Sequence, residues 1–507
     1  MAQRAVAIKA AGPAWVAAAL VLALTVGPLV AVAFRAQVGS GLAAGDWAAI
    51  RFTIWQAVVS ALASVALAIP VARALARRRF RGRAALVMLL GAPFLLPVIV
   101  AVLGLLAVFG RGGILNAMLG TIGIDPISIY GAAGVILAHV FFNLPLAVRL
   151  ILQGWLDIPA ERFRLAAQLN APVWRVLEWP MLVRVLPGTL LVIFLICLTS
   201  FAVALTLGGG PRATTVELAI YQAIRFDFDL GRAALLAASQ FVLCAVAAVV
   251  AWRITPVDGL GGGLDRVVAR WDQSPLDWLW LGAVTLFLVT PLAMIVLRGV
   301  PGFLDMPASV WTAAGRSIAV AVGSTVISVS LALTVALRGG AIAQVIGVTP
   351  LASSALVMGT GLFIIVYPVV SPTVVALPVT MVVNAMLALP FALRVLIPAV
   401  QDVRQNYARL AATLNLTGWR GLRIVMLPRL RRPLGFAAGL SAALSMGDLG
   451  VIALFATDAQ ETLPLAMYRL MGAYRMETAA SAALLLVALS LLAFWICDKG
   501  GRVDADL

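Results

Sequence analysis

Long apolar stretches separated by short polar segments dominate the hydrophobic pattern of this 507-residue chain. A bilayer core about 30 Å thick requires about 20 apolar residues per helix, and about twelve stretches approach that length. They lie near residues 14–34, 53–72, 84–109, 130–152, 185–206, 233–252, 278–297, 317–337, 350–368, 375–398, 433–456 and 478–497. The pattern therefore predicts an all-α integral membrane protein with about twelve transmembrane helices.

The first apolar stretch has two interpretations. It follows Arg4 and Lys9 and ends near the small residues Ala31-Val32-Ala33, an order that also suits a cleaved signal peptide. Its length of about 20 apolar residues favours a retained helix, because the apolar core of a signal peptide is shorter. We expect a retained first transmembrane helix.

An internal repeat divides the chain into two homologous halves of six predicted helices. The segment that begins at Leu144 aligns without a gap to the segment that begins at Leu389, an offset of 245 residues. The matched positions include Pro145 and Pro390, Arg149 and Arg394, Asp157 and Asp402, Arg164 and Arg409, Asn170 and Asn415, and Trp174 and Trp419. Chance similarity between apolar helices does not supply so many matched polar and aromatic positions, whereas transporters are often built as parallel duplications.

The domain organisation follows from the repeat and from a segment rich in glycine, charge and proline between the sixth and seventh stretches. The predicted parts are a cytoplasmic tail with the first helix at 1–48, a first transmembrane domain at 49–253, a cytoplasmic linker at 254–277, the seventh helix with an external loop at 278–311, a second transmembrane domain at 312–497 and a cytoplasmic tail at 498–507.

Charge sets the expected orientation. The chain has 37 Lys and Arg against 21 Asp and Glu, a formal net charge of +16. Most of the arginines lie in short segments on one side of the predicted spans, which fits the positive-inside rule better than a nucleic-acid-binding face. An even number of spans places both termini on that side. We predict a multi-pass inner-membrane protein with both termini in the cytoplasm, in contact with lipid but not with nucleic acid.

Composition excludes several kinds of chemistry. The two lysines, Lys9 and Lys499, follow Ile8 and Asp498 instead of the glycine that a phosphate-binding loop requires. One histidine and three scattered cysteines, all in apolar stretches, provide no metal-ligand spacing. No large loop clusters acids, histidines or nucleophiles. We therefore predict no catalytic residue, no cofactor and no metal site, and a chain that is not an enzyme.

The repeated loop contains apolar and basic residues at helical spacing. Phe163, Ala166, Ala167 and Leu169 occur in the first copy, and Leu410, Ala411 and Leu414 occur in the second. Each copy therefore predicts a short amphipathic helix, which lies either on lipid headgroups or against another protein. Small Ala-Ala pairs favour the protein, because a face that inserts into lipid usually carries bulky side chains.

An Ala-Ala pair followed by a proline at the foot of the next span, Pro180 or Pro428, resembles the EAA loop of ABC-importer permeases. The usual glutamate of that loop is replaced by leucine in both copies, and the usual glycine by Ala171 and Leu416. In that family the loop forms a coupling helix that docks in a groove of a cytoplasmic ATPase. The resemblance implies a first coupling loop with Glu161, Arg164, Leu165, Ala166, Ala167 and Asn170, and a second with Arg409, Leu410, Ala411, Ala412 and Asn415.

Several further segments resemble the permeases of bacterial thiamine and thiamine pyrophosphate ABC importers. They include LLPVIVAVLGLLAVFGRGG at 95–113, LTLGGGPRATTVELAIYQAI at 205–224 and SMGDLGVIALF at 445–455. The resemblance implies the type I importer permease fold, two copies of a separate ATPase and a periplasmic thiamine-binding protein. Ferric-iron permeases, which also fuse two six-helix halves, are the alternative. A proton-coupled secondary transporter is less favoured, because it would need more intramembrane acids than this sequence has.

Two polar residues inside predicted spans have open roles. Asp448, whose repeat partner at an offset of 245 is Val203, either lines the translocation path and attracts the positive thiazolium of thiamine or caps a helix break beside Gly447 or Gly450. His139 has no acid at helical spacing, so an interhelical hydrogen bond is favoured over a proton relay.

Overall fold

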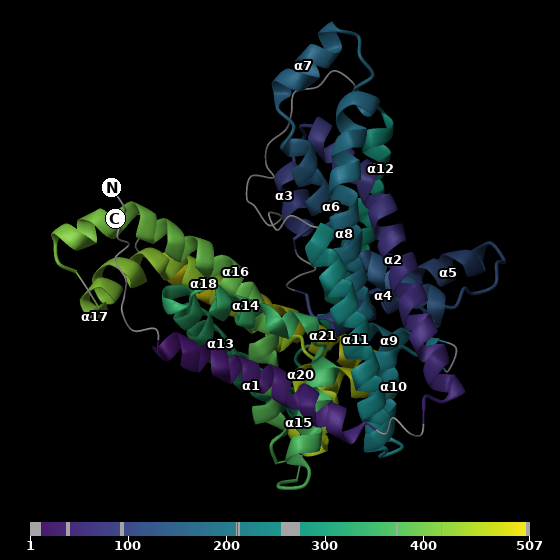
Figure 1. Cartoon of the computed structure of the whole chain (residues 1–507). Helices are drawn as coiled ribbons and strands as arrows, with labels where there is room; N and C mark the ends of the chain where they lie inside the picture. The colour runs from purple at the N-terminus through teal and green to yellow at the C-terminus, as the bar shows by residue number, and fades with distance from the viewer. Residues whose placement is uncertain are drawn as a thin grey trace. The chain divides into compact units, whose positions relative to one another are not determined.

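The computed structural model describes residues 12–36, 41–91, 96–208, 210, 213–254, 274–371, 374–416 and 418–502. These residues form helices and connecting turns without a strand (Figure 1). Eleven of the helices, or runs of consecutive helices, in the described part are long and apolar enough to cross a membrane. Arg4, Lys9 and most of the predicted linker lie outside the described residues. The prediction of an all-α integral membrane protein is confirmed.

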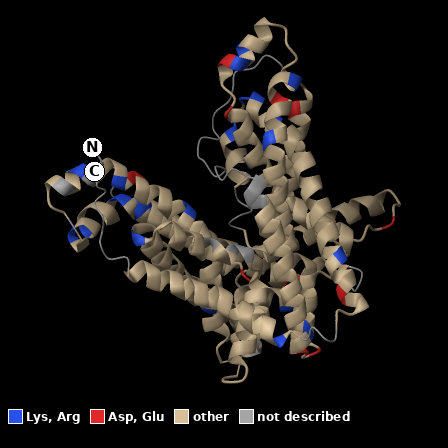
Figure 2. Cartoon of the chain, viewed as in Figure 1, with Lys and Arg blue, Asp and Glu red and all other residues tan. Residues whose placement is uncertain are grey.

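The chain forms two compact units. The N-terminal unit contains Leu42–Ala219 and Val242–Gly302, and the C-terminal unit contains Met1–Gly41, Ile220–Phe241 and Phe303–Leu507. Each unit therefore includes segments from the other half of the sequence. Charged residues lie mostly near the ends of the long helices, which are otherwise uncharged along most of their length (Figure 2).

The N-terminal unit is built around α2, α6 and α8, with α12 packed on α2 and α4. Asp277 at the start of α12 pairs with Arg77 and Arg78 at the end of α2, at 3.6 and 3.3 Å. Its helices are α2 Ala44–Arg77, α3 Arg83–Leu89, α4 Val98–Phe109, α5 Ile114–Thr121, α6 Ala132–Leu156, α7 Ala160–Gln168, the π-helix η3 Trp174–Glu178, α8 Trp179–Leu198, α9 Ala202–Leu207 and α12 Leu276–Gly299. Between α9 and α12, α10 Val216–Arg225 and α11 Leu230–Ile254 are each divided between the two units.

The C-terminal unit is built around α13, α16 and α18, with α21 packed on α18 and α1 packed on α15. The backbone of α1 comes so close to α15 that a Cβ atom on Gly361 would lie within 2.2 Å of the Pro28 carbonyl oxygen. Its helices are α1 Gly12–Arg35, α13 Ala308–Arg338, α14 Ala341–Val348, the 3₁₀ turn η5 Thr349–Ala352, α15 Ala355–Val366, α16 Ala376–Thr413, α17 Gly418–Gly421, the π-helix η6 Leu422–Met426, α18 Leu427–Met446, α19 Gly450–Phe455, the 3₁₀ turn η7 Asp458–Gln460, α20 Leu463–Gly472 and α21 Met476–Arg502.

The stretch predicted as a span at 350–368 is shorter than expected. Ser354 caps the N-terminus of α15 by accepting a hydrogen bond from the Val357 amide at 3.1 Å, and the preceding turn contains Pro350. These two features divide the apolar run between α14 and α15. The twelve residues of α15 extend about 18 Å, less than the hydrocarbon core of a bilayer.

The repeat continues beyond the aligned loop with a longer offset. The π-helices η3 and η6, the helices α8 and α18, and the short helices α9 and α19 each begin 248 residues apart. The three additional residues of the second copy are accommodated by α17, which has no equivalent in the first. Asp448 therefore corresponds to Ser200, and the pairing with Val203 predicted from the offset of 245 is wrong.

Buried polar side chains join the core helices of each unit. In the N-terminal unit His139 Nδ1 lies 3.3 Å from Ser60 Oγ, so α6 is hydrogen-bonded to α2. In the C-terminal unit Ser324 and Asn384 both bond Ser445 Oγ, at 2.6 and 3.1 Å. The predicted interhelical hydrogen bond of His139 is confirmed, and its repeat partner Asn384 has the same kind of role.

Candidate functional site

The first predicted coupling loop contains a separate short helix, α7. The chain leaves α6 at Leu156, and Pro159 precedes the first residue of α7. Proline suits a helix start because its fixed φ is helical and the amide it lacks has no intrahelical partner there. Glu161 lies in the first turn, where a negative charge favourably meets the helix dipole. The predicted short amphipathic helix is confirmed in this copy.

In the second copy the equivalent segment is the last part of α16, a continuous helix of 38 residues. Arg404 occupies the position of Pro159, and no proline interrupts the chain between Pro398 and Thr413. The expectation of a separate short helix is therefore wrong for this copy. Arg409, Leu410, Ala411 and Ala412 extend from the end of a transmembrane helix.

The matched asparagines terminate both helices. Asn170 and Asn415 have φ values of 49° and 51°, the left-handed conformation that asparagine tolerates better than most residues. The amide of Ala171 bonds the Ala166 carbonyl, and the amide of Leu416 bonds the Ala411 carbonyl, both at 2.8 Å. These are the six-to-one hydrogen bonds of a helix-ending motif. Because the left-handed residue is the asparagine, Ala171 and Leu416 replace the family's glycine without backbone strain.

Exposure divides the predicted apolar face of α7. Phe163 and Ala166 are buried against the unit, whereas Ala167 and Leu169 face outward together with Glu161, Arg164 and Asn170. Leu165 and Leu169 are 55% and 69% exposed.

The second copy presents the same pair, since Leu410 and Leu414 are 51% and 59% exposed. Arg409 and Asn415 are exposed as well, Ala411 is half-buried, and the side chain of Ala412 lies outside the described residues. Each loop therefore presents one leucine pair at equivalent positions, defined here as Leu165 with Leu169 and Leu410 with Leu414.

Asp448 lies in the break between α18 and α19. Its Oδ1 accepts a hydrogen bond from the Gly450 amide at 3.3 Å, as an acid that caps a helix start does. Its Oδ2 is buried and has no hydrogen-bond partner among the described residues. The geometry thus shows the predicted cap at the helix break. The second carboxylate oxygen takes no part in this cap.

Glu178 is a residue that sequence reasoning missed. It ends the π-helix η3 and is fully buried, with its carboxylate on Arg73 of α2 and Trp155 of α6. In the sequence it resembles one more charge of a cytoplasmic loop. Comparison of the two copies could have singled it out, because the equivalent residue in the second copy is the apolar Met426.

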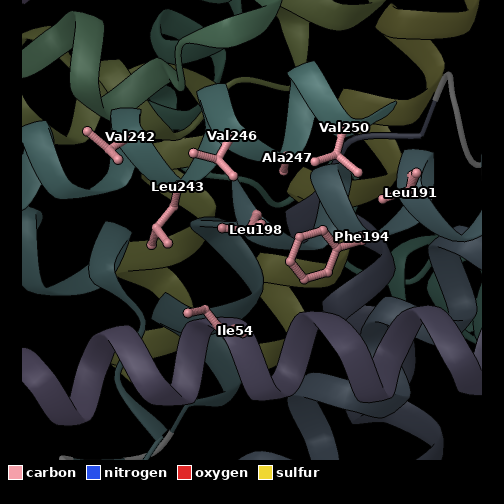
Figure 3. Close-up of a pocket in the computed structure, with 9 residues that line it drawn as sticks. All are labelled: Ile54, Leu191, Phe194, Leu198, Val242, Leu243, Val246, Ala247 and Val250. Carbon is pink, nitrogen blue, oxygen red and sulfur yellow. The ribbon is translucent and has the colours of Figure 1, made fainter. Parts of the chain in front are cut away.

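Two surface pockets are poor candidates for a substrate-binding site. One, of about 300 Å³, lies on the N-terminal unit between α2, α8 and α11, and every labelled side chain that lines it is a hydrocarbon (Figure 3). It provides no group to bind a charged solute. The other, of similar volume, lies on the C-terminal unit and contains Glu461 and Arg469, which pair with each other at 2.9 Å.

Comparison with known proteins identifies close relatives along nearly the whole chain. The chain is 39% identical to the thiamine transport system permease protein ThiP of Escherichia coli (strain K12), over 91% of this chain and 90% of that protein. It is 39% identical to the protein of the same name from Brucella abortus (strain 2308), over 95% and 94%, and 33% identical to that of Haemophilus influenzae, over 88% and 87%. No family model matches the chain. Identity of this extent, together with the all-helical membrane fold, shows that the chain belongs to the family of thiamine transport system permease proteins.

Proposed function

We propose that this chain is the permease subunit of an ATP-driven ABC importer that carries thiamine and phosphorylated thiamine across the inner membrane. The observation that carries the proposal is the 39% identity to thiamine transport permeases over nine-tenths of both chains. The permease performs no covalent chemistry in this proposal. A separate ATPase supplies the energy, and a periplasmic thiamine-binding protein delivers the substrate.

The two repeated loops are the proposed docking sites for two copies of the ATPase. The exposed residues Glu161, Arg164, Leu165, Ala167 and Asn170 form the first, where the buried Ala166 packs α7 against the unit. Arg409, Leu410, Ala411, Ala412 and Asn415 form the second. Matched leucine pairs exposed at both sites support one kind of partner for both. Glu161 is exposed one turn before Leu165, and an acid on that face suits a protein groove better than an anionic lipid surface.

The proposed orientation places both loops and both termini in the cytoplasm. It needs an even number of crossings and therefore counts the short α15, with the turns beside it, as the twelfth. The positive-inside rule supports it, because the loops and the segment from Arg73 to Arg83 contain many arginines. The homologous halves at 49–253 and 312–497, joined by the linker at 254–277, then move relative to each other when the ATPase pulls on the loops. This movement would expose the path alternately to the two sides.

Uptake by reconstituted vesicles tests the proposal. Vesicles that contain the permease, the ATPase and the binding protein should accumulate labelled thiamine only when ATP is enclosed. Transport by the permease alone under a pH gradient would indicate a secondary transporter. ATP-dependent uptake of ferric iron without thiamine would show that the substrate is wrong.

Asp448 is the proposed charged contact of the translocation path, supported by its buried Oδ2, which has no hydrogen-bond partner in the described part of the chain. The substitution Asp448→Asn retains an oxygen for the Gly450 amide but removes the charge that would attract a cationic thiazolium. We expect KM for thiamine uptake to rise roughly tenfold, equivalent to about 1.4 kcal/mol, at an unchanged amount of folded protein. Asp448→Ala also removes the cap and should lower protein stability as well. An unchanged KM in the asparagine variant would leave Asp448 with only the capping role.

A further inference from the structure

Three segments of the N-terminal unit meet at the carboxylate of Glu178. Arg73 of α2 approaches it with two nitrogen atoms, Nε at 3.1 Å from Oε1 and Nη2 at 2.7 Å from Oε2. Trp155 of α6 donates its indole N–H to Oε1 at 3.2 Å. The Arg73 guanidinium also lies over the ring of Trp174, 5.2 Å from its centroid. A two-nitrogen contact of this kind sets orientation as well as attraction.

These contacts enclose the first coupling loop from both ends. Trp155 is the next-to-last residue of α6, before the loop, whereas Trp174 and Glu178 begin and end η3, after it. The side chain of Glu178 is 0% exposed and that of Arg73 is 31% exposed. A buried charge persists only where it is paired, so the end of the loop after α7 is attached directly to α2 through Arg73. The end before α7 is attached to the same carboxylate through Trp155.

The second copy differs from the first in how its docking residues are connected to the transmembrane helices. Its docking residues continue α16 without a break, so a push on them passes along the helix backbone. In the first copy α7 is separated from α6 by the non-helical residues 157–159, which interrupt that route. Correspondingly, Met426 and Val400 occupy the positions of Glu178 and Trp155 in the second copy, where no carboxylate is required.

We propose that Arg73 and Glu178 are positioning residues that make the first coupling loop and α2 move as one body, so that force from the ATPase reaches the transmembrane core. The inference rests on the proposed ATP-driven function. It predicts that loss of the pair uncouples hydrolysis from transport, while the partner still binds and still hydrolyses ATP.

The test measures ATP hydrolysis and thiamine uptake in the same vesicles containing the complete complex. The main variant is the double substitution Arg73→Met with Glu178→Met, because an apolar replacement of a buried ion pair often preserves folding. We expect normal assembly, continued hydrolysis and a fall of at least about fivefold in thiamine transported per ATP. Arg232→Met, which breaks the exposed pair with Asp227, is the control and should keep the normal ratio.

A normal ratio in the assembled double variant would overturn the proposal and reduce the pair to a structural role. If the double variant does not fold, Arg73→Lys decides, since it keeps the charge but loses the two-nitrogen contact. Its ratio should fall about twofold or more, and an unchanged ratio would again overturn the proposal. Absence of ATP-dependent uptake in the unmodified complex would instead refute the proposed function itself.

Discussion

Replacing Leu165 and Leu410 together by aspartate is expected to abolish ATP-driven thiamine uptake and to release the ATPase from the permease. Both side chains are about half exposed, so the change costs the isolated permease little. In the proposed complex the same positions are buried in a groove of the ATPase. An aspartate buried there without a partner costs several kcal/mol, which corresponds to a loss of at least about a hundredfold in affinity at each site.

Copurification of the ATPase with the permease, followed by uptake in vesicles, measures the effect. Leu304→Asp is the matched control, because Leu304 is 89% exposed and belongs to neither loop. Each single variant should weaken assembly less than the pair, since one docking site remains. Normal copurification of the double variant would show that the leucine pairs contact lipid or solvent instead.

Replacing Gly361 by valine is expected to detach α1 from α15 and to destabilise the C-terminal unit. The first added carbon would lie 2.2 Å from the Pro28 carbonyl oxygen and 2.6 Å from the Pro28 Cα. A clash with backbone atoms is not relieved by a change of rotamer, so the cost should reach the upper end for overpacked sites, about 3 kcal/mol or more. The unfolding temperature of the purified permease in detergent should fall by several degrees.

Gly315→Val on α13 is the control, because nothing lies within 4 Å of its added carbon. Both variants place a β-branched residue in a helix, so their difference reports the contact between α1 and α15. An equal melting temperature for the two variants would argue that α1 does not pack there. That result would also revive the interpretation of the first apolar stretch as a cleaved signal peptide.

The candidate site was predictable from sequence to different degrees in its two copies. The repeat located both loops, and the matched Asn170 and Asn415 proved to end both helices. The residue spacing predicted a separate short helix in each copy. The structure has one in the first copy, where Pro159 precedes α7, but not in the second copy, which lacks that proline. Similarity of the matched residues did not reveal that one helical connection is broken and the other continuous.

The sequence by itself determined the class of the protein, the positions of most spans and the duplication. It could do so because hydropathy is summed along a local stretch and a backbone in lipid has to satisfy its own hydrogen bonds as a helix. Only the tertiary structure decided which side chains are covered: Phe163 is buried while Leu165 is exposed, and Glu178 is paired with Arg73, 105 residues away. Burial and pairing depend on neighbours that are remote in the chain, and no local pattern specifies them.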